Sequence, residues 1–166
     1  MFRLRRVPSQ NLTGEEVQSI LGKYGFYCSG EFSWSNPGGK GIANNFTSVH
    51  SGQTILDGAT GLLWQRSGSP KSMTFSEAQK YIEELNRQEF AGYSDWRLPT
   101  LEETMSLMEP AANRRLYIDA KFDAEQGWIW TSDIYSAGRA WYVGFLYGYC
   151  HPNGIVNGNY VRAVRS

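Results

Sequence analysis

Three segments of the chain carry apolar residues at helical spacing, and each begins at a threonine that a glutamate follows three positions later. The segments open at Thr13, Thr74 and Thr100. In this capping-box pattern the two side chains bond the free amides of the first helical turn. We therefore predict a helix after each threonine. The third is predicted to reach Met108 and to be stopped by Pro110, which cannot continue a helix.

Shorter segments with alternating or continuous apolar residues predict β-strands. Residues 53–57 and 61–65 flank a Gly58-Ala-Thr60 turn and are predicted to form a hairpin. Further strands are predicted at 127–131, 140–147 and 160–165. In the strand at 140–147, Trp141, Val143 and Phe145 form an apolar face opposite Tyr142, Gly144 and Leu146.

The N-terminal part is expected to contain a strand, a helix and a loop within residues 1–45. The basic start MFRLRRVPSQ is predicted to be an edge strand or the cut end of a longer protein. Residues 29–45 are rich in Gly, Ser and Asn and are predicted to form a loop. Residues 46–166 are expected to hold the core. Because strands are grouped apart from helices, we predict one α+β domain over 1–166 with an antiparallel sheet.

Composition excludes several classes of function. The chain has 166 residues, with 16 Lys and Arg against 16 Asp and Glu, so its formal net charge is zero. A neutral chain does not favour nucleic-acid binding through phosphate neutralisation. The sequence has no run of eighteen apolar residues, so we expect no membrane span. Two cysteines are too few for a disulfide framework, although they could form one disulfide or remain separate thiols. Because disulfide-rich proteins belong to oxidising compartments, we expect a cytoplasmic protein.

Candidate catalytic and metal-binding residues do not assemble into a known pattern. Adjacent residues of an extended chain point to opposite faces, so Cys150 and His151 are not expected to meet. Cys28, His50, Cys150 and His151 lack the spacing of a zinc site. The glycines around Lys40 do not match a phosphate-binding loop. We therefore expect no enzyme activity, no metal and no cofactor.

Five motifs follow one another along the chain: Thr60-Gly-Leu-Leu-Trp-Gln65, Tyr93-Ser-Asp-Trp-Arg-Leu-Pro-Thr100, Trp130-Thr-Ser132, Ala140-Trp-x-Val-x-Phe145 and Tyr160-Val-Arg-Ala-Val-Arg165. Together they resemble the bacterial Lcl C-terminal family of C-type-lectin-like domains. The resemblance covers roughly residues 45 to 166. Related folds include formylglycine-generating enzymes and the variable proteins of diversity-generating retroelements.

The resemblance implies a small twisted sheet packed with two to three helices, and a ligand-binding surface on the C-terminal strands and loops. It also implies that Trp96 is a core residue and that Arg97 is a structural hydrogen-bond donor. Trp64, Trp130 and Trp141 are likewise expected in the core. His151-Pro-Asn153 is similar to a calcium-binding motif of lectins, but it lacks the carboxylate that calcium needs.

The closing segment, residues 133–166, has an unusual composition. Residues 1–133 contain 27 Lys, Glu, Gln and Met residues, whereas the last 33 residues contain none. Retroelements of this kind randomise adenines in AAC or AAT codons, which cannot yield Lys, Glu, Gln, Met or Trp. An ordinary invariant domain rich in loops is the alternative explanation. The segment's predicted ligand-binding residues, together with Gly158, are Tyr135, Ser136, Tyr142, Gly144, Leu146, Tyr147, Tyr149, His151, Asn153, Gly154, Asn157 and Asn159.

Tyr, Ser, Gly and Asn are the residues of antibody loops, since Tyr gives rigid contact area and the others give adaptable hydrogen bonds. We predict a non-enzymatic module that binds a protein through a broad, fairly flat face and serves an upstream effector or sensor domain. A lectin-like module that binds glycans, with Tyr142, Tyr147 and Tyr149 stacked on sugar rings, is the first alternative. An oxidase of the formylglycine-generating type that uses Cys28 and Cys150 is the second.

Overall fold

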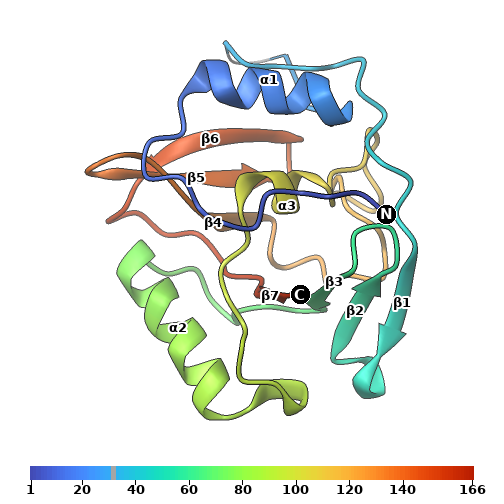
Figure 1. The fold of residues 1–166 in the computed structure, drawn as a ribbon, viewed down its shortest axis with the longest axis vertical. Coiled ribbons are helices and arrows are strands. Elements are labelled where there is room, and N and C mark those ends of the chain that lie inside the picture. The colour runs from blue at the N-terminus through green and yellow to red at the C-terminus, as the bar shows by residue number, and fades with distance from the viewer. Residues whose placement is uncertain (31–32) are drawn as a thin grey trace.

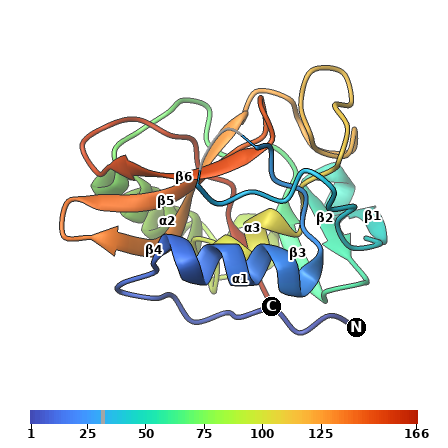
Figure 2. The same cartoon turned by 90° about the horizontal axis from the view of Figure 1, so that it is seen from above.

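The computed structural model describes residues 1–30 and 33–166 of the chain. Over this described part the fold is mixed α+β, with three α-helices and two antiparallel sheets of four and three strands. In Figure 1, helix α1 (Gly14–Tyr24) lies on one side of the three-stranded sheet, and helix α2 (Phe75–Arg87) lies on the other. Figure 2 shows the four-stranded sheet beside these layers.

The three capping boxes predicted from sequence are confirmed. Thr13 and Glu16 begin α1, and the equivalent pairs begin α2 and α3 (Leu101–Met105). The third helix ends at Met105 and does not reach Met108 as predicted. Ser106 Oγ donates a hydrogen bond to the Glu103 carbonyl at 2.6 Å, which competes with a further helical turn. Met108 is nevertheless buried.

The four-stranded sheet contains the predicted hairpin. Its strands β1 (Phe46–Val49), β2 (Thr54–Asp57), β3 (Leu62–Gln65) and β7 (Val164–Arg165) pair in the order β1-β2-β3-β7. Strand β1 was not predicted, because its sequence FTSV is only four residues long and half polar. Residues 29–45 were predicted to form a loop. Residues 31 and 32 lie outside the described residues; in the rest of this segment the structure has an isolated bridge residue but no strand.

The last predicted strand, 160–165, is shorter than expected. Only Val164 and Arg165 pair with β3 in a ladder. In the residues before Val164, side-chain oxygens accept hydrogen bonds that backbone carbonyls would accept in a regular strand. The Ala163 amide donates to Gln65 Oε1 at 2.8 Å, and the Val161 amide donates to Ser69 Oγ at 2.9 Å. This arrangement keeps the segment buried without strand geometry.

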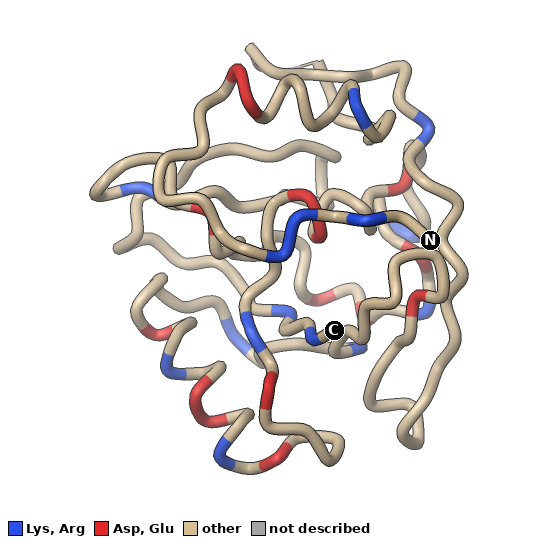
Figure 3. Tube along the Cα trace, viewed as in Figure 1, with Lys and Arg blue, Asp and Glu red and all other residues tan. Residues whose placement is uncertain are grey.

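The three-stranded sheet carries the closing segment. Strands β4 (Trp128–Ser136), β5 (Arg139–Gly144) and β6 (Tyr149–Gly154) pair in sequence order. Strands β4 and β5 were predicted with other bounds. The prediction for β4, 127–131, was too short, and the prediction for β5, 140–147, was too long, because residues 145–148 form the turn to β6. Strand β6 was not predicted, because its sequence YCHPNG contains proline and glycine. Within the described chain β6 pairs only with β5, and such an edge position tolerates Pro152. Figure 3 shows how few charged residues this sheet carries.

The N-terminal strand prediction is wrong. Residues 1–12, all within the described part of the chain, form no strand. They run as an extended strap across α3 and β4, where Arg5 pairs with Asp133 (Arg5 Nη1 to Oδ1, 2.7 Å) and with Glu102 (Nε to Oε1, 3.4 Å). Arg5 of this basic start therefore serves ion pairing within the fold rather than a sheet edge.

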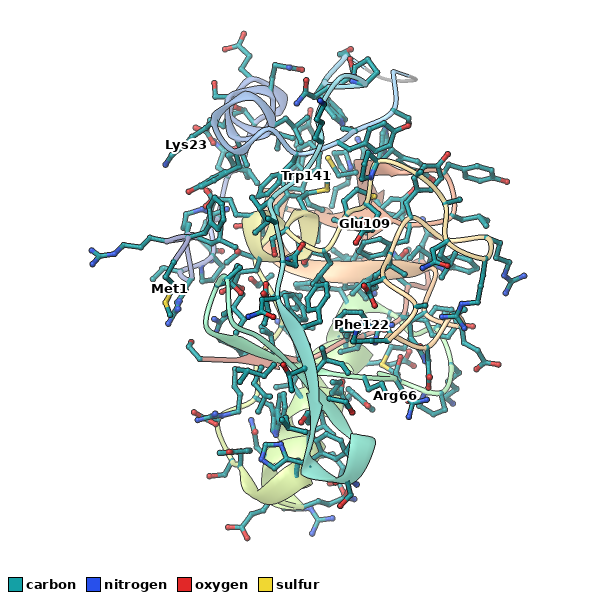
Figure 4. All side chains as sticks on the ribbon, turned by 90° about the vertical axis from the view of Figure 1, so that its right-hand side faces the viewer. Met1, Lys23, Arg66, Glu109, Phe122 and Trp141 are labelled. Atoms are coloured by element: carbon teal, nitrogen blue, oxygen red, sulfur yellow. The ribbon has the colours of Figure 1, made fainter. Side chains whose placement is uncertain are left out.

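The expected core residues are buried. Trp64, Trp130 and Trp141 are fully buried, and Trp96 is 2% exposed. Arg97 donates to both carboxylate oxygens of Glu103, at 2.8 and 2.7 Å, as the structural role predicted for it requires. Figure 4 shows Trp141 in the layer between α1 and the sheet, where its indole nitrogen donates to the Leu12 carbonyl at 2.8 Å.

Candidate functional site: a tyrosine pocket on the C-terminal sheet

The two faces of strand β5 have different surroundings. Trp141 and Val143 are fully buried on the face that packs with α1. On the opposite face, Tyr142 stands across from His151, and Gly144 stands across from Tyr149. This alternation agrees with the apolar and mixed faces read from the sequence.

The mixed face is hollowed by a pocket of about 240 Å³, which we call the tyrosine pocket. It is lined by Gly127, Trp128, Tyr142, Gly144, Leu146, Tyr147, Tyr149, Asn153, Gly158 and Asn159. We predicted a fairly flat face from the sequence, whereas the structure shows a hollowed one. Glycines at 127, 144 and 158 leave a hollow among larger aromatic neighbours. Gly144 allows Tyr149 to approach closely, because a Cβ at position 144 would stand 3.2 Å from Tyr149 Cζ.

The aromatic wall of the pocket is held by contacts among its own members. The hydroxyls of Tyr142 and Tyr149 share a hydrogen bond of 2.9 Å, and their rings meet edge to face at 5.9 Å. Tyr147 stacks on Tyr149 at 6.3 Å with 16° between the ring planes. These contacts fix the rings before any ligand binds, which lowers the entropy lost on binding.

Tyr142 stays neutral at physiological pH. Burial, followed by the neighbouring Tyr149 hydroxyl, raises its pKa well above the ordinary range for tyrosine. Among the described residues that line the pocket, no side chain is charged. The pocket therefore offers stacking surfaces and neutral hydrogen-bonding groups.

A Tyr142→Phe substitution is expected to lower the free energy of unfolding by about 1 kcal/mol at neutral pH, since it removes one neutral hydrogen bond. The deficit should shrink as pH rises above about 10, where the unfolded wild type loses the Tyr142 proton that the folded state keeps. Urea unfolding of both proteins between pH 7 and pH 11 measures this. Tyr147→Phe, at a 59% exposed side chain, is the control. A deficit that grows with pH would contradict the prediction.

Seven of the predicted ligand-binding residues line the tyrosine pocket. They are Tyr142, Gly144, Leu146, Tyr147, Tyr149, Asn153 and Asn159, and Gly158 joins them. Asn159 is 1% exposed, and its backbone exchanges hydrogen bonds of 3.0 and 2.9 Å with Met73. Its role in the pocket is thus mainly to shape the wall.

The structure places Tyr135 away from the pocket. Register shifts in β4 between Trp130 and Ser136 precede the turn, and Tyr135 packs edge to face on Trp141 at 5.7 Å. Arg139 lies over its ring at 5.4 Å. Tyr135 lines a separate recess beside α1, and Ser136 is exposed at the strand end.

The other predicted residues lie around the pocket on β6 and the loop after it. His151 Nδ1 donates to the Pro152 carbonyl at 2.7 Å, and its ring contacts Trp34 at 5.6 Å. Asn157 Nδ2 donates to Asn153 Oδ1 at 2.8 Å, which ties the exposed loop to the pocket rim. Gly154 ends β6 close to the Asn157 amide.

Sequence reasoning missed Trp128, which is the largest side chain of the pocket. It lies two residues before Trp130 on the same face of β4, yet it is 37% exposed whereas Trp130 is fully buried. Phe75 packs edge to face on the Trp130 ring at 5.4 Å, and the Trp130 indole nitrogen donates to the Met73 carbonyl at 2.8 Å. The search was confined to residue types that adenine randomisation can produce, so tryptophan was excluded from it.

Trp128 also lines a second recess of about 280 Å³. The two hollows share Gly127, Trp128 and Leu146, so the indole forms the ridge between them. The second recess adds Arg115 and Glu125, which bring charge of both signs. A ligand that filled both hollows would cross the Trp128 ring, which Tyr160 supports edge to face at 5.5 Å.

The cysteines and histidines lie outside the tyrosine pocket. Cys28 and Cys150 are buried free thiols in the core beneath α1. His50 lies in the short helix η1 (His50–Gly52), where its Nδ1 contacts Thr54 Oγ1 at 2.7 Å and its Nε2 contacts Tyr93 Oη at 3.3 Å. Within residues 1–30 and 33–166, no three His, Cys, Asp or Glu residues group as metal ligands. No helix of that same part is long and apolar enough to cross a membrane.

Comparison with known proteins adds the family to this geometry. The family model of the Lcl C-terminal domain matches residues 53–165, which include both sheets except β1. The chain belongs to the Lcl C-terminal domain family. No curated protein matches the sequence. The match of this Lcl C-terminal domain ends one residue before the chain does, so it includes the whole tyrosine pocket.

Proposed function

We propose that this Lcl C-terminal domain is a non-enzymatic recognition module, of C-type-lectin-like fold, whose tyrosine pocket binds a protein ligand. The observation that carries the proposal is the pocket itself. It is uncharged, walled by prearranged aromatic rings, and built almost entirely by the closing segment. Exposed Tyr and Trp beside polar amides are the residues that dominate protein-binding sites.

Two features favour a protein over a small ligand. The Trp128 ridge joins the tyrosine pocket to a second recess that carries Arg115 and Glu125. Tyr147 and Trp128, 59% and 37% exposed, extend the aromatic surface beyond the hollow. A continuous surface with an aromatic centre and charged margin matches the anatomy of protein interfaces. The module would act in the cytoplasm and serve a separate effector or sensor activity.

The retroelement origin of the closing segment is part of the proposal. All its pocket-lining residues belong to the types that adenine randomisation can produce, whereas Trp128 cannot arise in that way. Sequencing the gene across a natural population tests this. Substitutions should concentrate in codons 135–136, 142–147 and 151–159. They should spare Trp128 and Trp141 and, within the second range, Val143 and Phe145. A segment as constant as the rest of the gene would reject the retroelement origin.

Glycan binding is the second candidate. The observation that favours it is the size of the tyrosine pocket, about 240 Å³, together with rings on which a sugar could stack. A glycan array probed with the wild-type domain separates the two functions. Binding to defined glycans that Tyr149→Ala abolishes would establish the lectin function in place of protein recognition.

The oxidase alternative has less support, because the thiols it requires are buried beneath α1 rather than in the tyrosine pocket. Its test uses a peptide cysteine as substrate. Oxidation by the wild type and none by Cys28→Ser or Cys150→Ser would overturn the non-enzymatic proposal.

A further inference from the structure

The two cysteine side chains come from distant parts of the sequence and meet in the core. Cys28 lies in a short antiparallel bridge with Asn36, whereas Cys150 lies on the edge strand β6. Both side chains are fully buried in the apolar cluster that contains Trp141.

Backbone contacts hold the two segments together on either side of the thiols. The Ser29 amide donates to the Gly148 carbonyl at 2.7 Å. The Trp34 indole nitrogen donates to the Cys150 carbonyl at 2.8 Å. The segment that carries Cys28 is thus fastened to the chain next to Cys150 at two points, so the sulfur atoms approach within a fixed frame.

The two thiols have different acidities because they are hydrogen-bonded to each other. A hydrogen bond from the Cys150 side chain lowers the pKa of Cys28, against the opposing effect of burial. The same contact and burial raise the pKa of Cys150 well above its ordinary value. Cys28 is therefore the more acidic of the two thiols, and the thiolate is the reactive form of cysteine.

We propose that Cys28 and Cys150 are a redox pair, in which a peroxide oxidises Cys28 and Cys150 then closes a disulfide. In the first step the Cys28 sulfur attacks a peroxide oxygen, the O–O bond breaks, and hydroxide leaves as water with the original thiol proton. In the second step the Cys150 sulfur attacks Cys28 sulfenic acid, the S–O bond breaks, and a second water leaves with the Cys150 proton. Two thiols are oxidised and one hydrogen peroxide is reduced.

The Cys28 side chain is fully buried, but the chain reaches the surface within two residues, because Ser29 is half-buried and Gly30 is exposed. The proposal therefore requires a local opening of this segment to admit a small oxidant. The pair lies outside the tyrosine pocket, and the proposal does not depend on what the pocket binds.

The disulfide would fasten the Trp34 segment to the edge of the recognition sheet. Trp34 packs on both Trp141 and His151, at ring distances of 5.0 and 5.6 Å. A disulfide between residues 28 and 150 would close a loop of roughly 100 residues. Disulfides that close loops of this size stabilise the folded state strongly, because they restrict the unfolded chain. We expect the oxidised protein to melt roughly 5–10 °C above the reduced protein.

Mass spectrometry of the wild-type chain after treatment with hydrogen peroxide tests the proposal directly. The intact mass should fall by about 2 Da, because two hydrogen atoms are lost. Trypsin should then release residues 24–40 linked to residues 140–162, and dithiothreitol should separate them. Two thiols that stay free, independent sulfinic acids, or disulfides only between different chains would overturn it.

Two single variants separate the roles of the thiols. Cys150→Ser should stop at a Cys28 sulfenic acid that dimedone captures, whereas Cys28→Ser should leave Cys150 unmodified under the same treatment. Equal dimedone labelling of both variants would contradict the assigned order. If either variant fails to fold, the wild-type peptide map still decides whether the link forms. Binding assays on reduced protein test the pocket separately, so either idea can fail alone.

Discussion

Replacing Asp133 with asparagine is expected to lower the free energy of unfolding by about 3–5 kcal/mol, the cost of breaking a buried ion pair. The Asp133 carboxylate is fully buried and accepts hydrogen bonds from Arg5 Nη1 (2.7 Å), Arg5 Nη2 (2.9 Å), the Ser9 amide (2.7 Å) and the Leu101 amide (2.7 Å). It thus joins the N-terminal strap, β4 and the first turn of α3. An asparagine would direct its own amide hydrogens at some of these donors and leave Arg5 without its partner.

A matched variant distinguishes burial from simple ion pairing. Asp95 makes the same two-pronged contact with Arg165, at 2.6 and 3.0 Å, but its side chain is 57% exposed. Asp95→Asn should cost only about 0–1 kcal/mol, because water solvates the exposed Asp95 side chain and reaches the partly exposed Arg165. Urea unfolding followed by circular dichroism gives both values. If Asp133→Asn costs no more than Asp95→Asn, the strap is not held as the structure indicates.

Replacing Trp128 with alanine is expected to weaken binding of the protein ligand by roughly 30-fold to 1000-fold, equivalent to about 2–4 kcal/mol. The indole lines both hollows of the site, and it presents an exposed ring at their common ridge. Truncation would merge the hollows and remove the largest stacking surface. Because Trp128 is 37% exposed, the loss of fold stability should be small beside that of the buried tryptophans.

The experiment begins by capturing the ligand. Proteins of the source organism are cross-linked to the wild-type domain and to Trp128→Ala, and those retained only by the wild type are purified for titration calorimetry. Leu56→Ala is the control, since Leu56 is 39% exposed on the other sheet and outside both hollows. Affinities of Trp128→Ala and Leu56→Ala that agree within about threefold would show that Trp128 does not anchor the ligand.

Several features of this domain are determined by the sequence alone, because the interactions behind them span only a few residues. Each capping box joins residues three positions apart, and all three formed as the sequence indicates. The hairpin of β2 and β3 follows from its short turn. Alternation along the predicted strand 140–147 correctly assigns Trp141 and Val143 of β5, and Phe145 just after it, to the interior. Of the seven predicted ligand-binding residues in the pocket, only Tyr142 and Gly144 follow from this alternation; the other five lie on β6 and in the loops on either side of it.

Other features were decided only by the tertiary structure, because they depend on which distant segment covers which. Strand β6 forms despite Pro152 because only one of its edges pairs with another strand. Trp128 and Trp130 have the same place in the alternation, yet Trp130 is buried in a cluster with Met73 and Phe75 whereas Trp128 is 37% exposed. The strap at Arg5 and the meeting of Cys28 with Cys150 likewise join residues more than a hundred positions apart. Local pattern cannot specify such partners, since the free energy that selects them comes from packing the whole chain.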